Sequence, residues 1–170
     1  ADCHFALPDE RPGQQEVRHA GAGDEAGYGL ATDAQANVYL SGVTTYSWLG
    51  DGNAAPLHAF SGGDGYSTDI VVLKLNGSGA YQWHTFYGAS GTDDKGADIA
   101  WGGNGLSVAG TSADTWGNSL HAYTSERDIA ILRLNAAGQY QWHTFYGSTG
   151  EDSGAGVSVD ADGNSYIDCV

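Results

Sequence analysis

The histidines are the residues of this sequence with the widest chemistry, because imidazole binds metal ions and transfers protons near neutral pH. Four of the six form matched pairs in a repeated segment, His58 with His121 and His84 with His143. Equivalent positions in separate copies of a repeat lie far apart in space, so the members of a pair cannot share one metal ion. We therefore expect these side chains to pack and to form hydrogen bonds.

Acidic pairs and cysteines are the other candidates for catalysis. Asp93-Asp94 and Glu151-Asp152 resemble paired catalytic acids, but they recur at the same point of the repeat, which indicates a structural corner. Neither Cys3 nor Cys169 lies near a predicted helix N-terminus or a His-Asn constellation that would activate a thiol. We expect no catalytic residues, no bound metal and no cofactor, and predict that the protein is not an enzyme.

Two short motifs concern ions and modification. Asp160, Asp162 and Asn164 form an oxygen-rich run like a calcium loop, but the Glu that completes an EF-hand loop is missing. The matching run at 33–37 has one carboxylate fewer, so we favour a turn stabilised by Asp and Asn side chains. Calcium binding stays open as the alternative. Asn76 begins an N-glycosylation sequon at a predicted hairpin tip.

A sequence repeat carries all of these residues. The segment Tyr81–Gly88 returns unchanged at 140–147, and 69–76 returns with conservative changes at 128–135. A third, partial copy at 154–164 matches 27–37. Because a repeat of this kind is one supersecondary unit that stacks on its neighbours, the repeat decides the fold.

Each copy divides into four short strands, a to d, separated by Gly, Asn and Asp turns. Strand c is an almost continuous apolar run, as in strands covered on both faces. In strand d we predict Tyr81, Trp83 and Tyr87 on one face and His84 and Phe86 on the other. The expected strands are 27–33, 96–102 and 154–160 for a; 37–44, 105–111 and 164–169 for b; 69–75 and 128–134 for c; 80–87 and 139–146 for d.

The predicted fold is all-β and propeller-like, with four-stranded antiparallel blades. Residues 22–88 and 89–147 are two complete repeat units, and 148–170 supplies strands a and b of a split blade. Residues 1–21 align with strands c and d, with Asp2 on Asp69 and Gly21 on Gly88. We expect the half-blades to complete one another between subunits, or by ring closure within one chain.

The string from Asp128 to Asn164 resembles a known family, the bacterial β-propeller repeat often called the SBBP repeat. It combines Asp-Ile-Ala-Ile-Leu-Arg-Leu-Asn, Gln-Trp-His-Thr-Phe-Tyr-Gly and Val-Asp-Ala-Asp-Gly-Asn in order. The loop residues 115–117 and 122–123 are also similar to that family, and the resemblance covers about residues 20–170. It implies a secreted, propeller-like protein and carries over no catalytic residues.

Composition narrows the partners and the location. Six Lys and Arg stand against 21 Asp and Glu, a net charge of −15 that would repel nucleic acid and anionic membrane surfaces. No apolar run reaches the roughly 18 residues of a membrane span. The sequence lacks Met and begins with Ala, which we interpret as the product of signal-peptide removal. We expect a secreted, extracellular or cell-surface protein.

The two cysteines and the long b–c loops complete the set of candidate sites. Cys3 aligns with the start of strand c and Cys169 with the end of strand b, so a completed blade would bring them close enough for a disulfide, within or between chains. The b–c loops repeat their aromatic and His residues, which we expect to pack on the blade edge, with ligand binding as the alternative. The loop candidates are Trp48, His58, Phe60, Trp116, His121 and Tyr123.

Two functions remain after these exclusions. The first is an extracellular structural protein, a subunit of a head-to-tail filament or oligomer built by strand complementation and a disulfide. The alternative is a secreted propeller that binds carbohydrate or peptide through the aromatic loops. We favour the first, in which the protein is its own partner. The residues expected at the subunit contact are His4, Phe5, Ala6, Leu7, Val17, Tyr166 and Ile167.

Overall fold

The computed structural model describes residues 23–63 and 65–170, and the regular structure in this part is β-strand apart from one 3-10 turn, Asp51–Asn53. The all-β prediction is confirmed, and the expected strand limits differ from the observed ones by at most two residues. The predicted half-blade 1–21 lies outside the described residues, with Cys3, His4, Phe5, Ala6, Leu7 and Val17. The strands are β1 (Glu25–Thr32), β2 (Val38–Thr44), β3 (Asp69–Leu75), β4 (Tyr81–Tyr87), β5 (Asp94–Gly102), β6 (Gly105–Ser112), β7 (Asp128–Asn135), β8 (Tyr140–Tyr146), β9 (Gly154–Val159) and β10 (Ser165–Cys169).

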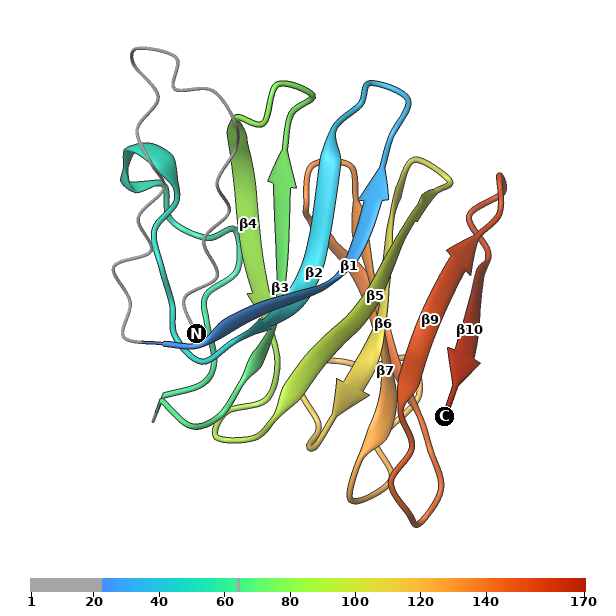
Figure 1. Cartoon of the computed structure of the whole chain (residues 1–170). Helices are drawn as coiled ribbons and strands as arrows, with labels where there is room; N and C mark the ends of the chain where they lie inside the picture. The colour runs from blue at the N-terminus through green and yellow to red at the C-terminus, as the bar shows by residue number, and fades with distance from the viewer. Residues whose placement is uncertain (1–22, 64) are drawn as a thin grey trace.

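These strands form three antiparallel sheets that follow one another along the chain (Figure 1). The first sheet has the order β1-β2-β3-β4, the second β5-β6-β7-β8, and the half-sheet consists of β9 and β10. The predicted four-stranded antiparallel units are therefore present. The three sheets do not close into a ring among the described residues.

Side-chain hydrogen bonds set the tight turns between the strands. Before β4, the Oδ1 atom of Asn76 accepts hydrogen bonds from the backbone N–H groups of Ser78 and Ala80 at 3.0 and 2.9 Å. Gly79, at φ 82°, supplies the left-handed conformation that this turn requires. Asn135 repeats the arrangement before β8. The Asn/Gly composition thus acts through the backbone geometry it stabilises.

The sheets stack face to face, and the core lies between them. β5 packs on β1 and β2, and β9 packs on β5 and β6, so each sheet lies on its predecessor in the same way. The approach is close at Gly29 of β1, where a Cβ atom would lie 2.6 Å from the Cα of Asp98. Large side chains fill the space between the first two sheets. The fully buried core residues include Tyr39, Ile70, Val72, Leu106, Val108, Leu132 and Leu134.

One prediction about strand d was wrong. Tyr81 was expected on the face of Trp83, but its hydroxyl lies 2.7 Å from Nδ1 of His84. The cause is a bulge: Lys74 pairs with Trp83 and Leu75 with Tyr81, so Gln82 has no partner. An unpaired residue shifts the alternation of faces by one position. β8 has the same bulge and brings Tyr140 to His143.

Candidate functional site

The two long loops between strands b and c cover the outer edge of the last strand of each sheet. In the first sheet, the N–H of Leu57 donates to the carbonyl of His84 at 2.9 Å, and the N–H of Phe86 donates to the carbonyl of His58 at 3.3 Å. In the second sheet, Leu120 and His121 repeat both hydrogen bonds on β8 at the same lengths. The loops therefore occupy an edge that would otherwise be open to another strand.

A stack of aromatic rings fixes each loop to its sheet. The His84 ring stacks on Trp48 with centroids 3.6 Å apart, and its Nε2 lies 3.1 Å from the Trp48 carbonyl. In the second sheet, His143 stacks on Trp116 at 3.7 Å, with Nε2 at 2.8 Å from the Trp116 carbonyl. Burial lowers the pKa of His143, which favours the neutral ring. Both His side chains thus pack and form hydrogen bonds, as expected.

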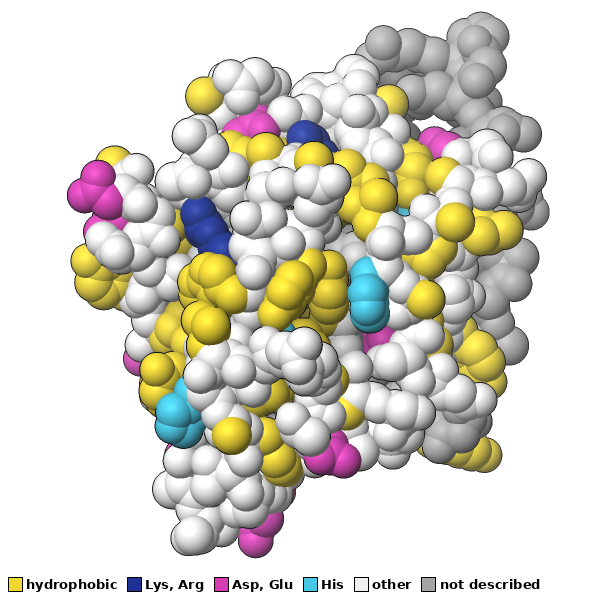
Figure 2. Space-filling view, turned by 180° about the vertical axis from the view of Figure 1, so that it is seen from behind, with side chains coloured by type: hydrophobic (Ala, Val, Ile, Leu, Met, Phe, Trp, Pro, Cys, Tyr) yellow, Lys and Arg dark blue, Asp and Glu magenta, His cyan; other side chains and the backbone are white. Residues whose placement is uncertain are grey.

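The other loop candidates also contact their own sheet. His58 stacks on Tyr87 at 4.7 Å, and Phe60 meets Phe86 edge-on at 5.8 Å. The Tyr123 ring meets Phe145 of β8 edge-on at 5.9 Å, and its hydroxyl donates to the carbonyl of Glu126 within the loop at 2.7 Å. Seen from behind, hydrophobic side chains spread over this side of the molecule with His side chains among them (Figure 2). The loops are structured, and their rings are engaged within the sheets.

The acidic corner of the first sheet is a buried network. Asp94 accepts hydrogen bonds from the N–H of Ala89 at 2.7 Å and from the Ser112 hydroxyl, and Asp69 accepts one from the N–H of Ser61 at 2.7 Å. The two carboxylates flank Gly88, where a Cβ atom would lie 2.7 and 2.8 Å from their oxygens. Burial raises the pKa of Asp94 to about 7. It also raises the pKa of Asp69.

The second sheet repeats this corner, with Asp128 as fully buried as Asp69 but with Asp152 only half-buried. Asp128 accepts a hydrogen bond from the N–H of Thr124 at 2.7 Å, and Asp152 accepts one from the N–H of Ser148 at 2.7 Å. Arg127 lies between the two corners, 3.6 Å from Asp93. Each acid therefore holds a backbone turn in place, which agrees with a structural corner.

The calcium candidate is a hydrogen-bonded turn. Oδ1 of Asp160 accepts from the N–H of Asn164 at 2.8 Å, and Oδ2 accepts from the Asn164 amide and from the Tyr166 hydroxyl. The hydrogen bonds from Asn164 lower the pKa of Asp160. Asp162 in the same turn is exposed. Within 23–63 and 65–170, no group of three or more His, Cys, Asp or Glu residues is placed to hold a metal ion.

Cys169 ends β10 and lies opposite Gly154, next to a bulge. Gly42 and Gly110 hold the same position in β2 and β6, beside equivalent bulges, so the structural register agrees with the sequence alignment. The Cys169 thiol is exposed and free among the described residues. The predicted bond to Cys3 involves a residue outside that part of the chain and stays a prediction. The described part also has no helix long and apolar enough to cross a membrane.

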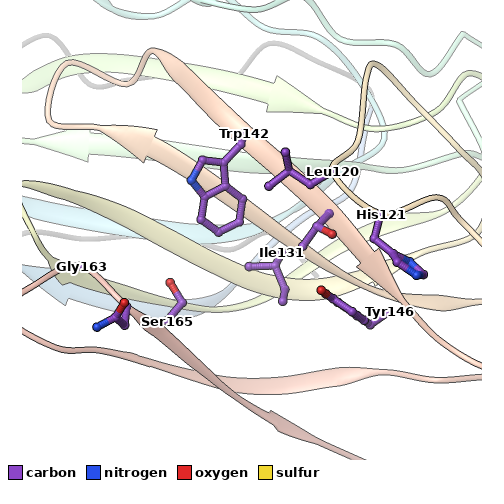
Figure 3. Close-up of a pocket in the computed structure, with 9 residues that line it drawn as sticks. Leu120, His121, Ile131, Trp142, Tyr146, Gly163 and Ser165 are labelled. Atoms are coloured by element: carbon purple, nitrogen blue, oxygen red, sulfur yellow. The ribbon is translucent and has the colours of Figure 1, made fainter.

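A groove of about 480 Å³ lies between the second sheet and the half-sheet, and we name it the Tyr146 groove (Figure 3). Side chains of β7, β8 and the preceding loop form one wall, and the turn before β10 forms the other. His121 is the one loop candidate in this lining. The lining residues are Leu120, His121, Ile131, Trp142, Thr144, Tyr146, Gly163, Asn164 and Ser165.

The repeat explains why this groove exists. Tyr146 is the repeat equivalent of Tyr87, yet Tyr87 is 5% exposed and Tyr146 is 53% exposed. The ring of Tyr87 lies 6.0 Å from the rings of both Trp116, in the b–c loop of the second sheet, and Tyr140, in β8. The half-sheet has no such residues among the described strands. The groove is therefore an inter-sheet face that is only partly covered.

The sequence pattern carried a signal for this face that we did not use. Trp142 and Tyr146 repeat Trp83 and Tyr87, so every contact that buries the first pair has to be supplied again for the second.

The glycosylation candidate Asn76 lies in the c–d turn. Its side chain is half-buried, and its Oδ1 atom accepts hydrogen bonds from Ser78.

No protein-family model matches the chain, and no curated protein is similar enough to it to count as a relative.

Proposed function

We propose that this protein is an extracellular structural subunit whose copies join head to tail, each supplying strands that complete the β9–β10 sheet of the next. In this proposal the sheets are blades of a propeller-like stack, like the repeat that the sequence resembles. The secreted or cell-surface location and the absence of catalysis belong to the same proposal. The protein is its own partner.

The observation that carries the proposal is that one edge of β10 is unpaired among the described residues. β2 and β6 each pair with a strand on both sides, whereas β10 pairs only with β9 among the described residues. Unpaired backbone N–H and C=O groups along a strand are a template for adding another strand. Tyr166 and Ile167 lie in this strand, as the predicted contact requires.

The half-sheet is already placed to receive further strands. Its β9 N–H at Val157 donates to the Asp98 carboxylate at 2.9 Å, and Ser165 shares a 2.7 Å hydrogen bond with Ser107. β9 also packs on β5 and β6 as β5 packs on β1 and β2. Strands that continue the half-sheet beyond β10 would therefore cover the Tyr146 groove. Edge and groove would be closed by the same event.

The register of the complete sheets also sharpens the disulfide prediction. Gly42 lies opposite Val71 in β3, so an incoming strand aligned as Asp2 on Asp69 places His4 opposite Cys169. Cys3 then points to the other face, because successive residues of a strand alternate. A Cys3–Cys169 bond requires the incoming strand to shift by one residue. Formation of the bond would therefore show that the incoming strand is shifted by one residue.

Deletion of residues 1–20 tests the proposal. Sedimentation velocity and electron microscopy of the intact chain should show concentration-dependent oligomers or fibres, and the deletion should leave short species. Denaturing electrophoresis without reductant should show a ladder that Cys169→Ser removes if the bond links subunits. An intact chain that stays monomeric at high concentration would contradict the proposal.

The second candidate function is carbohydrate or peptide binding, and the aromatic lining of the Tyr146 groove favours it. Trp142, Tyr146 and His121 together offer a ring-bearing surface next to polar groups. Titration of the protein with oligosaccharides, followed by tryptophan fluorescence, tests this second function. Saturable binding that Tyr146→Ala abolishes, in a protein that does not self-associate, would replace the first proposal by the second.

A further inference from the structure

The first sheet shows what covers an inter-sheet face of this protein. The second sheet brings the rings of Trp116 and Tyr140 to Tyr87, each with centroids 6.0 Å apart. Its turn also brings Gly138, where a Cβ atom would lie 2.6 Å from Leu57 and 2.9 Å from Trp83. A side chain at 138 would therefore clash with these two side chains unless they shifted. The cover consists of two rings and one turn glycine.

A single histidine positions both rings. The hydroxyl of Tyr140 lies 2.9 Å from Nδ1 of His143, and the His143 ring stacks on Trp116. The β8 bulge is what brings Tyr140 to the face of His143. The Tyr-x-x-His pair of the repeat is thus the element that presents an aromatic surface to the preceding sheet.

The face of the second sheet that lines the Tyr146 groove is equivalent to this face of the first sheet, but it lacks the cover. Ile131, Trp142 and Tyr146 repeat Val72, Trp83 and Tyr87 in position. Val72 is fully buried, while Ile131 is half-buried and lines the groove. β9 of the half-sheet packs on β5, β6 and β7 as β5 packs on β1, β2 and β3 of the first sheet. The uncovered part matches the place of a following β7–β8 hairpin.

We propose that the Tyr146 groove selects a strand hairpin that carries a Tyr-x-x-His pair preceded by a turn glycine, as residues 138–143 do. The inference rests on the proposed function, in which added strands complete the half-sheet at β10, and it states which hairpins the groove binds more tightly than residues 1–21. Residues 1–21 offer a backbone to β10 but no ring to Tyr146. Their aligned positions hold Pro12 for the glycine, Gln14 for the tyrosine and Val17 for the histidine.

Fluorescence anisotropy with three labelled peptides tests the selection against the full chain. The peptides are residues 126–148, residues 1–22, and residues 1–22 with Gln14→Tyr and Val17→His. Because any competition from the chain itself acts on all three equally, the ratios of their affinities remain informative. The first should bind about tenfold more tightly than the second, the size of effect expected for well-placed aromatic pairs. The third should recover part of this gain.

Variants of the protein show whether the tighter binding of the first peptide depends on the groove. Tyr146→Ala should remove the advantage of the first peptide, whereas Tyr28→Ala, at a position that is also 53% exposed, should leave it intact. Peptides that bind alike, but lose binding when Ile167→Pro interrupts β10, would overturn selection by the groove and leave the proposed function standing. Failure of all three peptides to bind would overturn both.

Discussion

The downstream faces of the first and second sheets carry the same residues in different surroundings. On the first, Tyr87 stacks on His58 and is closed off by the rings of the next sheet. On the second, Tyr146 stacks on His121 at 5.0 Å in the same way, but half of its surface remains exposed. The interactions within a sheet are therefore set by the local sequence. Burial of the face depends on the strands that pack against it.

The corners show the same difference. Gly88 and Ala89 are buried in the first corner, whereas their equivalents Gly147 and Ser148 are exposed. Asp94 is fully buried, whereas its repeat equivalent Asp152 is half-buried. A repeat protein gains much of its stability from the interface between neighbours. Paired substitutions at equivalent positions can measure that gain.

The largest effect is expected for the tyrosines themselves. Tyr87→Ala should lower the free energy of unfolding by about 3–5 kcal/mol, because it removes a large buried side chain and leaves a cavity. Tyr146→Ala should cost less than about 1 kcal/mol in the monomeric protein. Urea denaturation followed by tryptophan fluorescence measures both. Equal losses would show that the second face is already covered in solution.

Stability should also depend on pH through the buried corner. Because burial raises the folded-state pKa of Asp94 to about 7, the folded protein holds this proton more tightly than the unfolded chain. Its contribution is fully present below pH about 4 and is lost as the pH rises through about 7, at up to about 1.4 kcal/mol per pH unit. Denaturation series between pH 4 and 8 should show this slope.

Asp94→Asn should flatten the pH slope, since the amide has no proton to lose. Asp152→Asn, at the equivalent position in the second corner, where the side chain is half-buried, is the matched control and should leave the slope in place. Asp69 lies across Gly88 from Asp94 and contributes in the same direction, because burial raises its pKa as well. If the pH slope persists in the Asp94→Asn variant, it arises from Asp69 and not from Asp94.

A smaller effect is expected where the bulge joins tyrosine to histidine. Tyr81→Phe removes the 2.7 Å hydrogen bond to His84 and should cost about 1 kcal/mol, a typical value for a partly buried hydrogen bond. Tyr140→Phe removes the equivalent bond at a ring that is 40% exposed, and its cost should be smaller. Thermal denaturation of the two variants side by side provides the measurement. The reverse order would contradict the difference in burial between the two sheets.

The smallest effect concerns ions. Since the Asp160 carboxylate is occupied by hydrogen bonds from Asn164 and Tyr166, calcium or a chelator should leave the unfolding temperature unchanged. Isothermal titration with calcium should give no saturable heat. A calcium-dependent rise that Asp160→Ala removes would establish the alternative that the sequence left open.

Much of the fold was readable from particular residues. Asn76 and Gly79 mark a turn, the apolar run of β3 marks a strand covered on both faces, and the exact return of Tyr81–Gly88 marks a second copy of the same sheet. These signals are local, because turn chemistry and alternation act over a few residues. They predicted all ten strands of the described part, with limits within two residues of the observed ones.

What the sequence by itself determined is the repeated sheet: its strands, its turns, its acidic corner and the order of its loop residues. Tertiary structure alone decided which copy is covered. Tyr87 and Tyr146 lie in identical heptapeptides, so no local rule can separate them, and a bulge at Gln82 moved Tyr81 to a face that simple alternation did not predict. Burial is a property of contacts between distant segments, and two identical strands differ in it only through their neighbours.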